Sequence, residues 1–219
     1  MNLKHYQDKA VDSLKTEFYK LWKSGQRGSR LVFKAPTGAG KTIMAAEFLK
    51  RISGDAQFDP DKAFIWISFN PDLVEQSYKK LQDYLHGGVA GLYDTGEISQ
   101  RRKLGKNDVL FVNWQKIVQS VKSARNLKLR LNGESNISFD TFIDATRIDG
   151  REIVLIVDEH IGRSTPLAQK IIDQINPRIE IDISAAPSYV PTMEDYVAGK
   201  GALVMVTPSD VINAGLIKE

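Results

Sequence analysis

The residues best suited to chemistry lie between Ala35 and Thr42, where the chain reads A-P-T-G-A-G-K-T. This stretch meets the phosphate-loop pattern G-x-x-x-x-G-K-[ST] at every defined position except the first, where an alanine replaces glycine. Backbone N–H groups in such a loop point inward, and the dipole of the following helix favours an anion there. The pattern therefore predicts a site that binds the phosphates of a nucleotide.

Each residue type in this loop has a physical reason. Gly38 and Gly40 allow positive φ and a close approach of the backbone to the phosphates. The ammonium group of Lys41 reaches the β and γ phosphates of ATP in such loops, and the hydroxyl of Thr42 ligates Mg²⁺. The loop residues that we expect to bind nucleotide are Pro36, Thr37, Gly38, Ala39, Gly40, Lys41 and Thr42. The alternative is a glycine-rich turn with an incidental lysine, which the flanking strand and helix patterns disfavour.

Two adjacent carboxylates follow a continuous apolar run later in the chain. Residues Ile153–Val157 predict a buried central strand, and Asp158 and Glu159 come directly after it. Burying unpaired carboxylates is costly, so we expect them to face a cation or an open cleft. Next to a nucleotide, Asp158 would hold Mg²⁺ and Glu159 would orient and polarise the attacking water. The alternative is a strand that simply ends in a charged turn.

A glutamine near the start of the chain is a candidate for contact with the base. Gln7 ends the stretch L-K-H-Y-Q, upstream of the phosphate loop. Its side-chain amide offers both a donor and an acceptor, as the edge of adenine requires. A glutamine on a helix is more often solvated, but the phosphate loop nearby favours contact with adenine.

The elements that must position these residues follow from the hydrophobic pattern. It predicts helices over residues 3–22, 42–49, 73–85 and 166–175, and strands over 31–34, 63–68, 109–113, 153–157, 179–183 and 202–206. The strand over 179–183 alternates in polarity, so one of its faces is expected to be less apolar. This order predicts an α/β fold with a central, mostly parallel sheet flanked by helices on both faces. Ligands of such sheets bind outside the carboxyl ends of the strands.

Composition narrows the class of protein. The 219 residues, 42% of them hydrophobic, suit one α/β domain with a sizeable core. The net charge of +3 permits contact with nucleic acid without arguing for it, and the absence of cysteine excludes disulfides and thiolate metal sites. No apolar run is long enough to span a membrane and no signal peptide is present, so we expect a cytoplasmic protein.

We have one expectation each for a basic cluster, an irregular segment and the end of the chain. Arg101, Arg102 and Lys103, with Lys106, form a basic cluster that we interpret as a solvated face rather than a phosphate grip. Residues 123–150 look irregular and are expected to form an insertion or mobile connection, with a short helix over 139–147. The chain ends without a stop signal and is expected to continue into a longer protein.

Taken together, the motifs resemble those of a known family. They are Gln7, the phosphate loop, Phe69-Asn70-Pro71, Val112-Asn113-Trp114-Gln115, Asp158-Glu159-His160, Ser184-Ala185-Ala186-Pro187 and the closing Val211–Ile217. Their order resembles the first motor domain of superfamily 2 DEAD/DEAH-box helicases and translocases. More narrowly, the chain is similar to the ATPase part of type III restriction enzymes.

The resemblance implies a fold, cofactors and partners. It implies a RecA-like P-loop NTPase domain over residues 1–219, using ATP and Mg²⁺ and serving as the N-terminal motor of a longer protein. The implied partners are DNA, or RNA, a second RecA-like domain of the same polypeptide and a modification methyltransferase subunit. The resemblance also implies that the full-length protein is a restriction endonuclease subunit.

The resemblance also implies roles for further residues. Phe69, Asn70, Gln76, Asn113 and Gln115 would lie along the nucleic-acid strand, and His160 and Ser184 would couple nucleotide state to that strand. Two positions depart from the family pattern. His160 stands third in the acidic motif with Ile161 fourth, and Ala186 replaces the usual threonine of Ser-Ala-Thr. Both departures concern coupling rather than nucleotide binding.

The resemblance leads to one kinetic expectation and leaves two alternatives open. Such motors receive an arginine from the second domain, which is worth about a thousandfold or more in rate. We therefore expect this chain alone to bind nucleotide but to hydrolyse it slowly. The alternatives are a module without catalysis, in which nucleotide regulates binding to DNA or a partner, and a phosphate-loop kinase, to which the tandem carboxylates are less suited.

Overall fold

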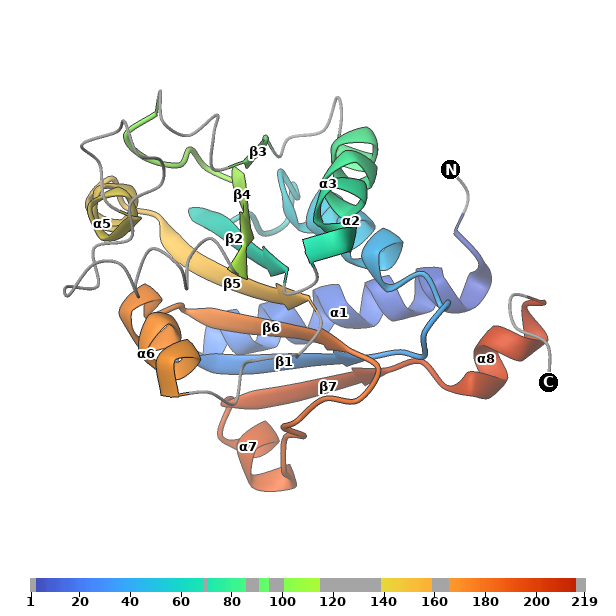
Figure 1. The fold of residues 1–219 in the computed structure, drawn as a ribbon. Helices are drawn as coiled ribbons and strands as arrows, with labels where there is room; N and C mark the ends of the chain where they lie inside the picture. The colour runs from blue at the N-terminus through green and yellow to red at the C-terminus, as the bar shows by residue number, and fades with distance from the viewer. Residues whose placement is uncertain are drawn as a thin grey trace.

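A parallel β-sheet forms the centre of the molecule (Figure 1). The computed structural model describes residues 3–68, 71–85, 91–94, 101–114, 139–158 and 166–215, without the side chains of 71–77 and 167. Within these residues the strands are β1 (Ser29–Lys34), β2 (Lys62–Ser68), β3 (Leu92–Asp94), β4 (Val109–Asn113), β5 (Glu152–Asp158), β6 (Ile179–Ser184) and β7 (Gly201–Met205). Their order is β3-β4-β2-β5-β6-β1-β7, and every adjacent pair is parallel.

Helices cover both faces of this sheet, as predicted (Figure 1). The described helices are α1 (His5–Ser24), α2 (Lys41–Ile52), α3 (Pro71–Leu85), α5 (Phe139–Ile148), α6 (Pro166–Ile175), α7 (Met193–Val197) and α8 (Pro208–Asn213). Buried side chains of α1, α2 and α3 pack on one face, and those of α5 and α6 pack on the other. The order of elements predicted this α/β arrangement, and the family resemblance implied its RecA-like form.

Strand β2 shows how two apolar layers follow from a continuous apolar run. Successive side chains of a strand point to opposite faces. Phe64 and Trp66 accordingly join the α1–α2–α3 layer, and Ile65 and Ile67 join the α5–α6 layer. All seven positions of β2 are buried, as expected for a strand covered on both sides.

Strand β6 has the less apolar face that its alternation predicted, and this face is buried. Glu180 and Asp182 lie on its polar face, yet they are only 3% and 1% exposed. Their burial follows from topology, because β6 lies between β5 and β1 inside the sheet. The guanidinium of Arg30 on β1 lies 3.6 Å from the Glu180 carboxylate and supplies a compensating charge.

The segment expected to be an insertion is in part a core element. Residues 139–148 form α5, and Phe139, Phe142 and Ile143 are buried against the sheet. The short helix predicted over 139–147 is therefore confirmed, and it belongs to the packed layer. Residues 115–138 lie outside the described residues, so an insertion there stays a prediction. The pattern did not predict β3, α7 or α8.

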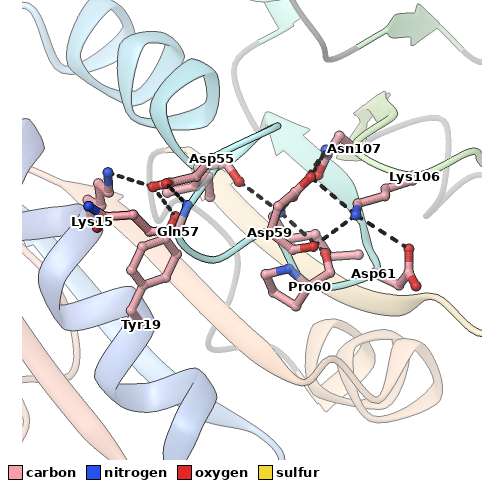
Figure 2. A network of polar contacts seen from close by, with 11 residues as sticks. Lys15, Tyr19, Asp55, Gln57, Asp59, Pro60, Asp61, Lys106 and Asn107 are labelled. Carbon is pink, nitrogen blue, oxygen red and sulfur yellow. Dashed lines mark hydrogen bonds and ion pairs between the residues drawn. The ribbon is translucent and has the colours of Figure 1, made fainter.

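A polar network holds the amino ends of β2 and β4 (Figure 2). The Asp59 carboxylate pairs with Lys62 at 2.7 Å and with Lys106 at 3.2 Å, and it accepts a hydrogen bond from Asn107. The buried ammonium of Lys62 also donates to the carbonyl of Ile52, the last residue of α2. The network therefore ties the end of α2 to the starts of two strands.

The basic cluster lies in the same region and is engaged by acids. Arg101 pairs with Asp108 at 3.2 Å, and Lys103 pairs with Asp149 at 2.6 Å. These residues precede β4 and β5, so they lie at the amino edge of the sheet, a strand's length from the carboxyl ends. The arrangement agrees with the interpretation as a solvated face.

Candidate functional site

The carboxyl ends of five neighbouring strands bring the candidate residues to one edge of the sheet. Asn113 of β4 is in register with Ser68 of β2, which is in register with Asp158 of β5. On the other side of β5, Ser184 of β6 is in register with Lys34 of β1. The phosphate loop leaves the sheet directly after Lys34. The predicted clustering at the carboxyl edge is therefore observed for the described residues.

The phosphate loop joins the end of β1 to the start of α2. Gly38 and Gly40 have φ of 82° and 84°, the left-handed region that glycine adopts without strain. The N–H of Ala39 donates to the carbonyl of Pro36 at 3.2 Å and closes a turn. Thr37 and Gly38 are exposed at the tip, so the loop opens to solvent.

Lys41 and Thr42 are the first two residues of α2 and are half-buried. The ammonium group of Lys41 lies 3.4 Å from the carbonyl oxygen of Pro36, so its side chain folds back across the loop. A helix start offers backbone N–H groups without partners inside the helix. Together with the ammonium group, they form a donor set that suits phosphate oxygens.

Asp158 ends β5 and is 8% exposed. By strand alternation its side chain lies on the same face as Val154 and Ile156, which pack in the layer that contains α2. The carboxylate of Asp158 and the hydroxyl of Thr42 thus belong to the same side of the sheet, and both are oxygen donors that suit Mg²⁺. Among the described residues, no group of three or more acidic or histidine side chains forms a complete metal site. Mg²⁺ bound together with substrate phosphates needs no such group.

Gln7 contacts the phosphate loop from the first turn of α1. Its side-chain nitrogen donates to the carbonyl of Ala39 at 3.1 Å, and its side-chain oxygen accepts from the N–H of Lys4 at 2.9 Å. Gln7 as a whole is 6% exposed. Both ends of the amide therefore have partners within the chain, and contact with adenine stays a prediction.

Tyr6 is a neighbour of this loop that the sequence analysis did not identify. Its hydroxyl donates to the same Ala39 carbonyl at 2.9 Å. Partial burial raises the pKa of Tyr6, so the hydroxyl keeps its proton at neutral pH. An aromatic residue at the start of an amphipathic helix is indistinguishable by pattern from an ordinary core residue, so no signal in the sequence pointed to this contact.

Ser184 connects β6 to the start of the phosphate loop. Its backbone carbonyl accepts from the N–H of Ala35 at 3.1 Å. Its buried hydroxyl accepts from the N–H of Ala186 at 3.1 Å and fixes the turn after β6. Ser184 therefore lies against the base of the phosphate loop, and its coupling role stays a prediction.

Several predicted site residues lie outside the described residues. These are Phe69, Asn70, Gln115, Glu159 and His160. Gln76 lies in α3, where only the backbone is described. The assignments of Glu159 to water activation and of the others to nucleic acid or coupling therefore stay predictions.

Comparison with known proteins agrees with this fold. Residues 1–189 match the family described as "Type III restriction enzyme, res subunit". No curated protein matches the sequence.

Within the described residues, no helix is both long and apolar enough to cross a membrane.

Two solved structures share the fold at low sequence identity. One is a nuclease-deletion mutant of the type ISP restriction-modification enzyme LlaGI in complex with a DNA substrate mimic, with 13% identity and a TM-score of 0.58 over 99% of this chain. The other is the UvsW helicase from bacteriophage T4, with 17% identity and a TM-score of 0.51 over 94% of this chain. The chain spans 21% of the first protein and 61% of the second.

Proposed function

This chain belongs to the family of type III restriction enzyme res subunits, and from that premise we propose that it binds ATP with Mg²⁺ and hydrolyses ATP when nucleic acid is bound. Its fold is that of a helicase motor domain. The finer proposal is that residues 1–219 act as the first motor domain of a DNA helicase or translocase.

The geometry of the phosphate loop is the observation that carries this proposal. Gly38 and Gly40 take left-handed φ, and Lys41 opens a helix at the carboxyl end of β1. Local backbone conformation and sheet position thus agree with the sequence motif. A glycine-rich turn with an incidental lysine would require neither the two left-handed glycines nor the helix start behind them.

The residues divide the chemistry between them. Lys41 and the loop N–H groups would bind the phosphates, and Thr42 and Asp158 would hold the metal ion. Glu159 would orient a water molecule and accept its proton as the water attacks the γ-phosphate. Bound Mg²⁺ supplies neutralisation of the charge that develops on the phosphate oxygens.

The nucleic-acid partner would lie along the same edge. Asn113 ends β4 in register with Ser68 of β2. Strands β2 and β5 lie between β4 and the β6–β1 pair that carries Ser184 and the loop. Phe69, Asn70, Gln76 and Gln115 would extend this track, and His160 and Ser184 would couple it to the nucleotide. Binding to DNA should then weaken as the salt concentration rises. The logarithm of the binding constant should fall by about 0.7 to 0.9 per neutralised phosphate for each unit in the logarithm of the salt concentration.

Efficient turnover would need a further domain. An arginine supplied across the site by a second RecA-like domain is worth about a thousandfold or more. We therefore propose that this chain alone binds ATP and hydrolyses it slowly. A nuclease activity and a methyltransferase partner are proposals for the whole protein, drawn from the family.

Two substitutions test the proposal. Lys41→Ala should weaken binding of a fluorescent ATP analogue by about 100-fold, because it removes a charge-assisted phosphate contact worth up to ~3 kcal/mol. Lys50→Ala, on the exposed side of the same helix, should bind like wild type. Glu159→Gln should keep binding and lose turnover.

The other outcomes discriminate the alternatives. Unchanged turnover in Glu159→Gln favours a module without catalysis. Phosphate transfer to an added acceptor, instead of release to water, favours a kinase. Equal binding by Lys41→Ala and wild type would refute the proposed nucleotide site.

A further inference from the structure

The carbonyl oxygen of Ala39 receives two side-chain hydrogen bonds from α1. The Tyr6 hydroxyl donates at 2.9 Å and the Gln7 amide nitrogen donates at 3.1 Å. Ala39 itself is fully buried. One peptide group of the phosphate loop is therefore held by two donors from a helix that lies more than thirty residues away in the sequence.

This contact sets the direction of a backbone donor. In a trans peptide the C=O and the following N–H point in opposite directions. The described residues contain no cis peptide bond. Because the Ala39 carbonyl faces α1, the N–H of Gly40 faces away from α1. Gly40 immediately precedes α2, where backbone N–H groups are the phosphate ligands of such a loop.

The position of α1 against α2 is itself secured. Arg51 of α2 pairs with Asp8 at 2.6 Å and with Asp12 at 2.7 Å, both on α1. Gly40 also packs closely, because a Cβ there would lie 2.7 Å from the Gln7 amide nitrogen. Tyr6 and Gln7 thus belong to a helix, α1, that ion pairs join to α2, the helix that follows the phosphate loop.

We propose that Tyr6 is a positioning residue for phosphate binding. Its hydroxyl, together with Gln7, holds the Ala39–Gly40 peptide with its N–H directed toward a bound phosphate. The proposal rests on the proposed nucleotide site and assigns Tyr6 no contact with the nucleotide. Gln7 has a second task, because its amide oxygen also caps the start of α1 through the N–H of Lys4.

The test is Tyr6→Phe, which keeps the ring and removes only the hydroxyl. Loss of one neutral hydrogen bond to a buried carbonyl should weaken ATP binding by about threefold to tenfold. Inorganic pyrophosphate, used as a competitor of a fluorescent ATP analogue, should lose affinity by the same factor. A contact with the base alone would leave pyrophosphate affinity unchanged.

Tyr19→Phe is the matched control on the same helix. In the wild-type chain the hydroxyl of Tyr19 donates to the Asp55 carboxylate at 2.8 Å, away from the phosphate loop. This variant should lose stability without losing affinity for ATP or pyrophosphate. Thermal unfolding of both variants separates a loss of folding from a loss of positioning.

A double substitution tests whether both donors act on one carbonyl. Combining Tyr6→Phe with Gln7→Leu should weaken pyrophosphate binding by more than the product of the two single effects, because only then does the buried carbonyl lose both donors. Tyr6→Phe with wild-type affinity for both ligands would overturn this inference alone. Failure of the wild-type chain to bind ATP would overturn the proposed function and the inference with it.

Discussion

The backbone N–H of Ala35 donates to the backbone carbonyl of Ser184 at 3.1 Å. This bond joins the first residue of the phosphate loop to Ser184, the last residue of β6. Two residues after Ser184 stands Ala186, which replaces the threonine of the family pattern. The end of β6 and the base of the phosphate loop are therefore joined through main-chain atoms. A change in the side chain of Ser184 leaves this bond intact.

Ser184→Ala should separate nucleotide binding from coupling. The variant loses the hydroxyl that accepts from the N–H of Ala186 and so loosens the turn after β6. ATP affinity should stay within about twofold of wild type, while single-turnover hydrolysis in the presence of DNA should fall about fivefold, the equivalent of one hydrogen bond. The measurement is the ratio of hydrolysis rates with and without DNA.

Ser29→Ala is the control for that measurement. The buried hydroxyl of Ser29 lies within hydrogen-bond distance of the carbonyls of Gln26 and Gly199 at the amino end of β1, away from the site. This variant should leave the ratio unchanged. Equal ratios in all three proteins would remove Ser184 from the coupling role.

Gly40→Ala should impair both folding and nucleotide binding. The residue has φ of +84°, and an added Cβ would lie 2.7 Å from the Gln7 amide nitrogen. The left-handed conformation alone costs about 1–2 kcal/mol, and displacing Gln7 breaks its bond to Ala39 for about 1 kcal/mol more. Chemical unfolding and ATP titration measure the two effects.

Gly28→Ala isolates the conformational part of that cost. Its φ is +73°, but a Cβ there would meet nothing within 4 Å. The free energy of unfolding should fall by about 1–2 kcal/mol, with ATP affinity unchanged. Should both variants behave alike in the two assays, the close contact between Gly40 and Gln7 would have no energetic importance.

Lys62→Met should destabilise the fold without acting on the site. The lysine is fully buried, pairs with Asp59 and donates to the end of α2. Removing one member of a buried pair leaves the other charge uncompensated, which costs about 3–5 kcal/mol; the remaining pair of Asp59 with Lys106 favours the lower value. Urea unfolding measures the loss.

Lys103→Met provides the comparison for that experiment. Lys103 pairs with Asp149, but about half of its side chain is exposed. An exposed ion pair contributes about 0–1 kcal/mol, so this variant should unfold close to wild type. A loss of similar size in both variants would contradict the importance assigned to burial.

Stability should fall in acid in part through Asp55 (Figure 2). Hydrogen bonds from Lys15, the N–H of Gln57 and Tyr19 hold the pKa of Asp55 well below its usual range. Because the folded pKa is below the unfolded value of about 3.9, the unfolded state binds more protons in this range. The stabilisation is therefore full above about pH 4 and is lost as the pH falls below it.

Asp55→Asn tests this origin. The variant should be less stable than wild type at pH 7, and the difference should shrink as the pH is lowered below about 4. Asp61→Asn changes a carboxylate that is mostly exposed and should follow the wild-type profile at all pH values. Parallel profiles for Asp55→Asn and wild type would contradict the assignment. Urea midpoints at each pH provide the measurement.

The sequence by itself determined the local features of the nucleotide site. The glycines that adopt positive φ, the helix that begins at Lys41 and the buried strand that ends at Asp158 are each encoded within a few neighbouring residues. Hydrophobic periodicity also specified most of the segments that form strands and helices, because a buried face imposes a period of two or 3.6. The fold class followed from the order of these elements.

Only the tertiary structure decided how distant segments meet. Gln7 and Tyr6 reach the carbonyl of Ala39 because α1 packs beside the phosphate loop, and no pattern within either segment encodes that contact. The same holds for the burial of Glu180, which follows from the place of β6 between two strands. Strand order arises from the packing of whole faces, so contacts across it become visible only when the chain is folded.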